Sequence, residues 1–408
     1  MTSQDAFVVI GGGLAGATGA EALRTQGFDG SISLISNEVN RPYNRPPLSK
    51  GYLSGADDRE SVFVHPKDWY QDNHVHLHLG NAAVRIDRIE HAIALADGSV
   101  QPYAKLLIAT GSTPRQLKVP GSDLPGIHYL RSIEQSEHIK SAFADARSVV
   151  MIGAGWIGLE TAAAARAAGL DVTVIEAAAL PLIAILGEQV AQVFADLHRA
   201  HGVDLRCDVT VKSIVGANGK VSGVELGDGS VIAADMVVVG IGIVPEVSLA
   251  QQAGLETENG ILVDEHLRSS DADIYAAGDV ANAFNPRIGR HIRVEHWANA
   301  LNMPAVAASG MLGQEAVYDR LPFFYSDQYD LGLEYRGHAG PDEADQVVIR
   351  GDLPGRAFIA FWLRQDRVLA GMNVNIWDAG DDVRTLIESK RRVDVLQLAN
   401  PDIALASI

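Results

Sequence analysis

The chain has 408 residues, 47% apolar and 21% charged, which is typical of a globular protein of about two to four domains. Its formal net charge of −18 argues against nucleic-acid binding, and its single cysteine, Cys207, excludes an intrachain disulfide or dithiol centre. No apolar run is long enough to span a membrane, and Met1–Phe7 lacks the basic region of a signal peptide, so we expect a cytoplasmic protein without membrane contact.

The first elements predict a dinucleotide-binding unit. In chain order they are an apolar strand, a glycine turn, a helix and a second strand: Phe7–Ile10, Gly11–Gly16, Ala17–Gln26 and Ser31–Ile35. Gly11 permits the tight turn, Gly13 leaves room for a pyrophosphate, and Gly16 lets the helix pack closely on the sheet. The helix N-terminus then faces the phosphate charge, and we assign this first site to FAD.

An acidic residue is expected at the end of the second strand, where it binds ribose hydroxyls. Glu38 is the best candidate although it lies one or two residues late, and Asn37 could share the role. A solvated strand end is the alternative explanation for Glu38.

The same pattern returns later in the chain and predicts a second nucleotide site. Its elements are Ser148–Ile152, the turn Gly153-Ala-Gly155-Trp156-Ile157-Gly158, an alanine-rich helix to Ala168, and Asp171–Ile175. Glu176 follows directly, where a carboxylate accepts hydrogen bonds from ribose hydroxyls and repels a 2′-phosphate, so we expect NADH rather than NADPH. Glu160, in the first helical turn, is expected to contact the nicotinamide end; helix capping is its alternative.

Two βαβ units in one chain indicate two parallel α/β domains. We expect a discontinuous FAD domain over residues 1–112 and 241–320, an NAD domain over 113–240, and a C-terminal α+β domain over 321–408. The last assignment rests on aromatic segments such as Ala357–Leu363, which predict antiparallel strands.

Five further segments carry a resemblance to a known family. They are Arg41-Pro-Tyr-Asn-Arg-Pro-Pro-Leu-Ser-Lys50, Ala109-Thr110-Gly111, Ile274–Asp279, Arg293–Asn299 and Met372–Asp378. Together they resemble the NADH-dependent ferredoxin reductases, which include putidaredoxin and rhodocoxin reductases and the reductase components of aromatic-ring dioxygenases. The resemblance covers almost the whole chain and implies a glutathione-reductase-like fold.

The resemblance also implies roles for individual residues. Lys50 is expected beside the flavin ring, and Glu160 and Glu295 on either side of the nicotinamide; these three form the expected catalytic set. A surface lysine opening a helix is the alternative for Lys50, and a simple N-cap is the alternative for Asp279. The other expected cofactor contacts are Leu14 and Ala15 beside the glycines, Arg45, Ala83 or Val84 at the adenine, Arg131 at the phosphates, Gly242, Gly278, Asp279, His296 and Trp297. Two positions depart from the family pattern: Asn37 stands where an acid is common, and Glu246 where we expect asparagine.

The electron outlet follows from cysteine positions. Disulfide reductases of this fold need cysteines over the flavin, and the corresponding segment Asn40–Gly55 has none. The chain also lacks the cysteine cluster of an iron–sulfur centre, so we expect a separate 2Fe–2S ferredoxin as acceptor, serving a haem monooxygenase or ring-hydroxylating dioxygenase. Candidate docking residues for an acidic ferredoxin are Arg287, Arg290, Arg293 and Lys390-Arg391-Arg392.

Alternatives remain open at this point. One is an NADH-sensing flavoprotein of the apoptosis-inducing-factor type, and another is a reductase of a small quinone-like acceptor. The chain is expected to be a monomer or weak homodimer. His74, His76 and His78 share a predicted strand face, but without an acidic or cysteine pattern nearby we expect no metal site.

Overall fold

The computed structural model describes residues 6–340 and 342–408, so Met1–Asp5, on which the expectation about a signal peptide depends, lie outside it. The chain forms two compact units, which are described separately. Unit 1 combines residues 6–46, 58–113 and 243–322, and unit 2 combines 47–57, 114–242 and 323–408. No helix within the described residues is long and apolar enough to cross a membrane.

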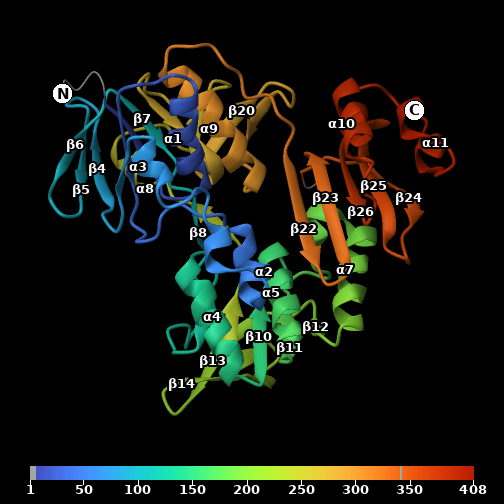
Figure 1. The fold of residues 1–408 in the computed structure, drawn as a ribbon. Helices are drawn as coiled ribbons and strands as arrows, with labels where there is room; N and C mark the ends of the chain where they lie inside the picture. The colour runs from blue at the N-terminus through green and yellow to red at the C-terminus, as the bar shows by residue number, and fades with distance from the viewer. Residues whose placement is uncertain (1–5, 341) are drawn as a thin grey trace. The chain divides into compact units, whose positions relative to one another are not determined.

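Unit 1 is built on a five-stranded parallel sheet with the order β19-β7-β1-β2-β3. Its strands are β1 Ala6–Ile10, β2 Ser31–Ile35, β3 Val75–His78, β7 Lys105–Ile108 and β19 Ile274–Ala276. All five residues of β1 are buried, as expected for a central parallel strand covered on both faces. Two helices that pack against each other, α1 Leu14–Thr25 and α9 Trp297–Met311, lie beside this sheet (Figure 1). The parallel arrangement brings the carboxyl ends of β1, β2, β7 and β19 to one edge, where α/β sheets bind ligands.

Smaller elements complete unit 1. Two three-stranded sheets have the orders β4-β5-β6 and β18-β20-β21. Their strands are β4 Ala83–Asp87, β5 Ala92–Leu95, β6 Val100–Pro102, β18 Ile261–Val263, β20 Ala281–Asn285 and β21 Arg290–Ile292. The short helices are η3 Arg59–Val62, α3 Trp69–Asp72, α8 Ser248–Gln252 and η4 Gly278–Val280.

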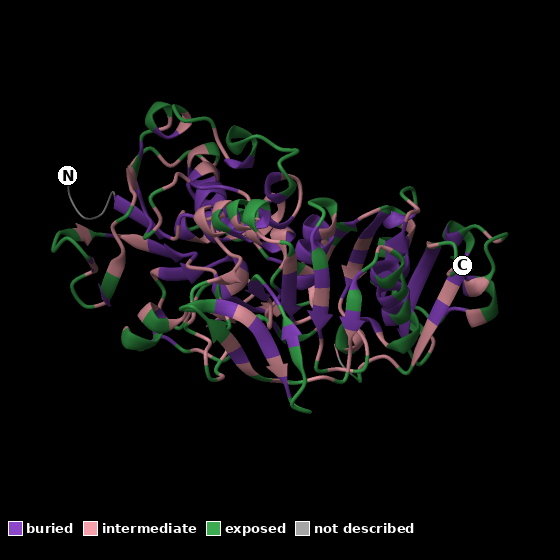
Figure 2. Cartoon of the chain, turned by 90° about the horizontal axis from the view of Figure 1, so that it is seen from below, coloured by how far each residue is buried: buried purple, intermediate pink, exposed green. Residues whose placement is uncertain are grey.

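Unit 2 repeats the parallel architecture with the strand order β12-β11-β10-β16-β9. The strands are β9 Ile127–Tyr129, β10 Ser148–Ile152, β11 Asp171–Ile175, β12 Asp204–Arg206 and β16 Met236–Val239. The accompanying elements are η2 Pro46–Ser49, α2 Gly51–Ser54, α4 Ile133–Asp145, α5 Trp156–Ala167, α6 Ile183–Leu186, α7 Glu188–Ala200, β13 Val211–Ala217, β14 Lys220–Leu226 and β15 Val231–Ala233. Figure 2 shows the strands mostly as buried and the outer turns of helices as exposed, as layered α/β packing requires.

The last part of unit 2 is an antiparallel sheet with the order β22-β23-β26-β25-β24. Its elements are β22 Phe323–Gln328, β23 Leu331–Gly337, β24 Gln346–Asp352, β25 Ala357–Arg364, β26 Arg367–Val374, α10 Gly380–Ser389 and α11 Val395–Ala399. The predicted antiparallel strands are therefore confirmed, and the bounds of the predicted C-terminal domain stay a prediction. One apolar cluster joins this sheet to the parallel domain, since it contains Phe194 of α7 together with Leu333 and Trp362.

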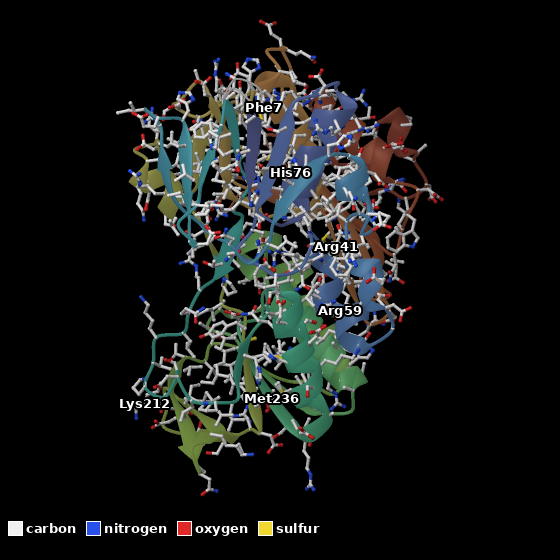
Figure 3. All side chains as sticks on the ribbon, turned by 60° about the vertical axis from the view of Figure 1, so that its left-hand side comes forward. Phe7, Arg41, Arg59, His76, Lys212 and Met236 are labelled. Carbon is white, nitrogen blue, oxygen red and sulfur yellow. The ribbon has the colours of Figure 1, made fainter. Side chains whose placement is uncertain are left out.

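The predicted fold class, two parallel α/β domains with a C-terminal domain, agrees with this architecture. The two units do not correspond one to one with the three expected domains, because the regions 113–240 and 321–408 both fall largely in unit 2. Which nucleotide each domain binds stays a prediction. The prediction that three histidines share a strand face is wrong: His74 precedes β3 and has a left-handed φ of 52°, so only His76, labelled in Figure 3, and His78 lie within the strand.

Candidate functional site

The first glycine loop, between β1 and α1, is closed at two of its glycines and open at the third. Gly11 has a φ of 133°, and a Cβ there would lie 2.0 Å from the carbonyl oxygen of Ala109. A Cβ on Gly16 would lie 1.9 Å from the carbonyl oxygen of Gly11. At Gly13 a Cβ would meet no atom within 4 Å. The chain itself therefore needs Gly11 and Gly16, whereas open space at Gly13 fits a pyrophosphate held at the start of α1.

The second glycine loop, between β10 and α5, has the same geometry. Gly153 has a φ of 100°, and its Cβ would lie 2.4 Å from the carbonyl oxygen of Gly240. A Cβ on Gly158 would lie 2.1 Å from the carbonyl oxygen of Gly153, and one on Gly155 would meet nothing within 4 Å. Both predicted nucleotide loops therefore offer the same opening for a phosphate-bearing ligand.

The acidic residue after β2 is held by the segment that follows it. Glu38 accepts a short hydrogen bond from the Tyr43 hydroxyl. It also forms an ion pair with Arg45 at 2.7 Å. Burial lowers the pKa of Arg45, but attraction to Tyr43 and Glu38 outweighs it and the pKa is raised, so the guanidinium stays charged. The backbone of Tyr43 bridges to Gly13, which places Glu38 and Arg45 beside the first loop; Asn37 is exposed.

Arg41, which precedes Tyr43 in the same segment, packs against an aromatic ring. The Arg41 guanidinium, labelled in Figure 3, lies 3.5 Å from the centroid of the Phe63 ring, a cation–π contact. The same guanidinium forms an ion pair with Glu60 at 2.6 Å. Arg41 therefore has a structural role that fixes the path of the chain towards Arg45.

Glu176, after β11, lies directly against the second glycine loop. One carboxylate oxygen accepts a hydrogen bond from the backbone N–H of Ala154 at 2.7 Å, and the other accepts from Ala178 at 2.9 Å. Each oxygen keeps a second lone pair, so the carboxylate can also accept from ribose hydroxyls. Its negative charge beside the loop disfavours a 2′-phosphate.

Several predicted FAD contacts meet at the carboxyl edge of the unit 1 sheet. The Ser112 hydroxyl, just after Ala109-Thr110-Gly111, donates to the Asp279 carboxylate at 2.8 Å. Gly278 has a φ of 79°, and a Cβ there would lie 3.0 Å from the side chain of Ala15, the residue after Leu14. The residues around Ala15, Thr110 and Asp279, all predicted to contact FAD, are therefore neighbours in space.

Glu246, which departs from the family pattern, has a structural role. Its backbone carbonyl accepts from the Thr110 hydroxyl at 2.7 Å, and its N–H donates to Gly111 at 2.9 Å. Its carboxylate accepts a short bond from the Ser248 hydroxyl at the start of α8. The bonds to the Thr110–Gly111 turn come from the backbone, so they do not depend on the side chain at position 246.

Other predicted contacts have defined places. The register of β4 with β5 shifts between Ala83 and Arg85, so Val84 sits at a bulge and is exposed. In unit 2, Trp156 packs edge-on against Phe194, while Ile157 is exposed beside the second loop. The remaining positions in unit 2 are Arg131, whose N–H donates to Gln135 at 2.7 Å, and Gly242, whose carbonyl accepts from Arg115 at 2.9 Å.

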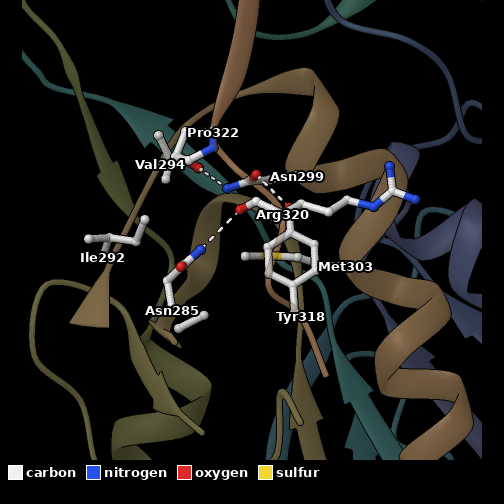
Figure 4. Close-up of a pocket in the computed structure, with 9 residues that line it drawn as sticks. Asn285, Ile292, Val294, Asn299, Met303, Tyr318, Arg320 and Pro322 are labelled. Carbon is white, nitrogen blue, oxygen red and sulfur yellow. Dashed lines mark hydrogen bonds between the residues drawn. The ribbon is translucent and has the colours of Figure 1, made fainter. Parts of the chain in front are cut away.

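Glu295, His296 and Trp297 lie at the start of α9, with His296 as N-cap. Arg293 pairs with Glu295 at 2.7 Å, and the Trp297 indole donates to Asn44 at 3.1 Å. A cavity of about 10 Å³, room for roughly one water, lies next to this turn (Figure 4). Its polar lining is bonded internally, for example Tyr318 to Asn299 at 2.9 Å, and burial raises the pKa of Tyr318. The cavity is therefore a small gap in the packing beside this turn.

The expected catalytic residues fall into both units. Lys50 and Glu160 belong to unit 2 and form an ion pair at 2.6 Å, whereas Glu295 belongs to unit 1. The side chain of Glu160 is 4% exposed, and it also accepts hydrogen bonds from Ser49 at 2.5 Å and Ser326 at 2.7 Å. A buried carboxylate with three donors is far more than a helix cap requires.

The basic candidates for docking are not equivalent. Arg287 is paired with Asp319 at 2.8 Å, and the Arg293 side chain is only 8% exposed. Arg290 and the run Lys390–Arg392 are exposed. The expectation that all of these side chains are available for docking is therefore wrong for Arg293, because its guanidinium is buried against Glu295.

Sequence reasoning missed several residues of these sites: Tyr43, Ser49, Ser112, Ser326 and Gln328. Tyr43 and Ser49 lie inside the segment Arg41–Lys50 that was singled out, so their position was a usable signal. Ser326 and Gln328 lie far along the chain, and nothing local marks a serine or glutamine as the partner of a distant carboxylate.

The fold and the two open glycine loops together define a two-nucleotide oxidoreductase. Residues 5–303 match the family described as pyridine nucleotide-disulphide oxidoreductase, and residues 323–408 match the reductase C-terminal domain. The chain belongs to the pyridine nucleotide-disulphide oxidoreductase family.

Individual relatives and a solved structure support the same family. The chain is 42% identical to rhodocoxin reductase of Rhodococcus erythropolis over 90% of this chain and 86% of the relative. It is 41% identical to the ferredoxin–NAD(+) reductase component of the anthranilate 1,2-dioxygenase system of Burkholderia cepacia, over 99% of both chains. A crystal structure of the covalent putidaredoxin reductase–putidaredoxin complex superposes with a TM-score of 0.95 at 34% identity, covering 100% of this chain and 98% of that one. The resemblance to ferredoxin reductases predicted from the motifs is confirmed.

Proposed function

We propose that this chain is an NADH-dependent FAD flavoprotein that reduces a separate 2Fe–2S ferredoxin, which in turn serves a haem monooxygenase or a ring-hydroxylating dioxygenase. The observation that carries the proposal is the absence of cysteine from Asn40–Gly55 in a member of a disulphide oxidoreductase family. Cys207, just after β12, is half-buried, and burial raises the pKa of its thiol, so it is a poor redox group. Electrons must therefore leave without a sulfur relay.

Each glycine loop and the residues beside it bind one of the two nucleotides. Bound FAD would supply the hydride-accepting and single-electron chemistry of the reaction. The loop at Gly13, with Glu38, Arg45 and Asp279 nearby, holds the FAD. The loop at Gly155, with Glu176, holds NADH and selects against NADPH.

Lys50 and Glu160, both in unit 2, act at the reacting end, and the role of Glu295 beside the nicotinamide stays a prediction from the resemblance. The Lys50 ammonium would place a fixed positive charge where negative charge develops during hydride uptake, a preorganised electrostatic effect. Glu160 fixes that ammonium, because the two groups lie 2.6 Å apart. No general base is required, since the nicotinamide C–H bond breaks as hydride.

The experiment is a rapid-mixing measurement of flavin bleaching with NADH and with NADPH, followed by cytochrome c reduction through a panel of 2Fe–2S ferredoxins. We expect fast bleaching by NADH, much slower bleaching by NADPH, and cytochrome c reduction only with ferredoxin present. A colourless protein that does not take up FAD, or a yellow one left unbleached by NADH, contradicts the proposal. Slow turnover with a long-lived charge-transfer complex favours an NADH sensor instead.

Docking of an acidic ferredoxin is tested by charge reversal. Arg290→Glu and the triple reversal of Lys390–Arg392 change exposed cations, and Lys118→Glu changes an exposed lysine elsewhere as the matched control. We expect a lower rate of ferredoxin reduction with a weaker salt dependence in at least one of the two docking variants, with unchanged flavin bleaching. Unchanged rates and salt dependence in both refute docking through these residues.

We also propose a cytoplasmic location and a monomer or weak homodimer. The strongly acidic charge supports this, since like charges oppose self-association. Gel filtration over a range of protein concentrations tests the oligomeric state, and a stable larger assembly contradicts it.

A further inference from the structure

Strand β22 carries two polar residues on its buried face. Along the strand Tyr325 and Asp327 are exposed, whereas Ser326 and Gln328 are each 1% exposed. Buried positions of a strand are normally apolar, and a buried polar side chain must be hydrogen-bonded to be tolerated. Ser326 and Gln328 are therefore expected to have hydrogen-bond partners in the interior.

The partners form one continuous chain of hydrogen bonds within unit 2. The Ser326 hydroxyl lies 2.7 Å from Oε1 of Glu160, and Nε2 of Gln328 lies 3.3 Å from the Ser326 hydroxyl. Nε2 of His198, on α7, lies 2.9 Å from Oε1 of Gln328. The chain thus connects the C-terminal sheet and α7 to the carboxylate that pairs with Lys50.

The donors in this chain all point towards Glu160. A carboxylate only accepts, so the single proton of the Ser326 hydroxyl is donated to it. Ser326 can then only accept from Gln328, which must present its NH₂ group to the serine and its oxygen to His198. His198 in turn must carry its proton on Nε2. Aligned donors polarise one another, so the chain strengthens the last bond to the carboxylate.

His198 is suited to the far end of the chain because it stays neutral. Burial lowers the pKa of this imidazole to about 4, and the neighbouring His201 acts in the same direction, while the bond to Gln328 opposes them. The charged and titratable groups that influence the other end are Lys50, Asp327 and Tyr325. Burial and Glu160 raise the pKa of Asp327, while Lys50 opposes them.

We infer that Ser326 and Gln328, anchored by His198, are positioning residues that orient the Glu160 carboxylate and through it the Lys50 ammonium for reaction with the nicotinamide nucleotide. This inference rests on the proposed function, in which Lys50 and Glu160 act at the reacting end. It gives the C-terminal domain a part in flavin reduction, because Ser326 supplies one of the three donors to Glu160.

The test is the pH profile of flavin bleaching by NADH under single-turnover conditions, in the FAD-loaded full-length protein. Ser326→Ala removes one donor that stabilises the charged carboxylate, so we expect the acid limb of the profile to move to higher pH. Gln328→Met keeps the side-chain volume but removes the amide, so we expect a smaller shift in the same direction. Ser326→Thr keeps the hydroxyl, so the wild-type profile should return.

The matched control is Ser213→Ala, which removes a serine–glutamate hydrogen bond of 2.6 Å on β13 and should leave the profile unchanged. FAD content and thermal transition identify any variant that fails to fold, and if Ser326→Ala fails, Gln328→Met decides. Folded Ser326→Ala and Gln328→Met proteins with the wild-type profile overturn the inference. A wild-type protein that NADH does not bleach defeats the proposed function instead.

Discussion

Replacing the open glycine of each loop, Gly13 or Gly155, with alanine tests the two predicted nucleotide sites one at a time. At Gly13 the backbone has φ −93° and ψ −171°, which alanine adopts freely, and a Cβ meets nothing within 4 Å. Gly13→Ala should therefore leave the free energy of unfolding of the FAD-free protein within about 0.5 kcal/mol of the wild type. Gly155, with φ −78° and ψ 179°, has the same freedom in the second loop.

The loss should appear in cofactor binding. The methyl group of Gly13→Ala occupies the space assigned to the pyrophosphate and displaces it from the N–H groups at the start of α1. Each charge-assisted hydrogen bond lost costs about 1.5–3 kcal/mol, which is roughly a 10- to 100-fold weaker affinity for FAD. Gly155→Ala should keep its flavin and raise the KM for NADH by a similar factor.

Flavin content, FAD titration of the FAD-free protein and NADH kinetics measure these effects. The control is Gly16→Ala, where the added Cβ would lie 1.9 Å from a backbone oxygen. Such overpacking costs about 1–3 kcal/mol or more, so this variant should lose stability before any question of binding arises. A Gly13→Ala protein that binds FAD as tightly as the wild type, or a Gly155→Ala protein that loses flavin instead of NADH affinity, refutes the assignment of the two loops.

Three further predictions concern single residues. Glu176→Ala removes the acceptor of two backbone N–H groups and the charge that repels a 2′-phosphate, so the preference for NADH over NADPH, measured as a ratio of kcat/KM values, should fall by about tenfold. Because burial holds the pKa of His198 at about 4 while the unfolded value is near 6.5, the unfolded chain binds the extra proton, and the free energy of unfolding should fall by roughly 3 kcal/mol as the pH drops from 6.5 to 4. Chemical denaturation at several pH values checks this, and a His198→Asn variant with an equally steep decline contradicts it. Cys207→Ser should leave NADH oxidation and ferredoxin reduction unchanged in steady-state assays, and a loss of turnover would show that the thiol takes part.

The glycine loops could be predicted from the sequence because their requirements are local. A Cβ on Gly16 would meet the carbonyl of Gly11 in the same turn, and Gly11 itself has a φ of 133°, so local backbone geometry requires both glycines. The carbonyl nearest to Gly11 belongs to Ala109, which is distant in sequence. Glu176 could be predicted in the same way, because it follows its strand directly and lies against the adjacent glycine loop. The C-terminal antiparallel strands were also visible, since aromatic and β-branched runs have a local preference for that geometry.

The environment of Glu160 could not be predicted, because it depends on segments far apart in the chain. Ser49 and Ser326 reach the same carboxylate from positions 111 and 166 residues away. Nothing in the local sequence of β22 distinguishes a serine facing solvent from one facing a buried charge. The burial of Arg293 and the structural role of Glu246 were hidden for the same reason.

The sequence by itself determined that this protein binds two nucleotides through strand–turn–helix units, and that no cysteine pair lies over the flavin, since both follow from residue type and spacing. The tertiary structure alone decided which donors surround Glu160 and which basic side chains are paired. The physical reason is that a buried charge is stabilised by whichever polar groups folding brings within about 3 Å, and sequence distance does not measure that separation.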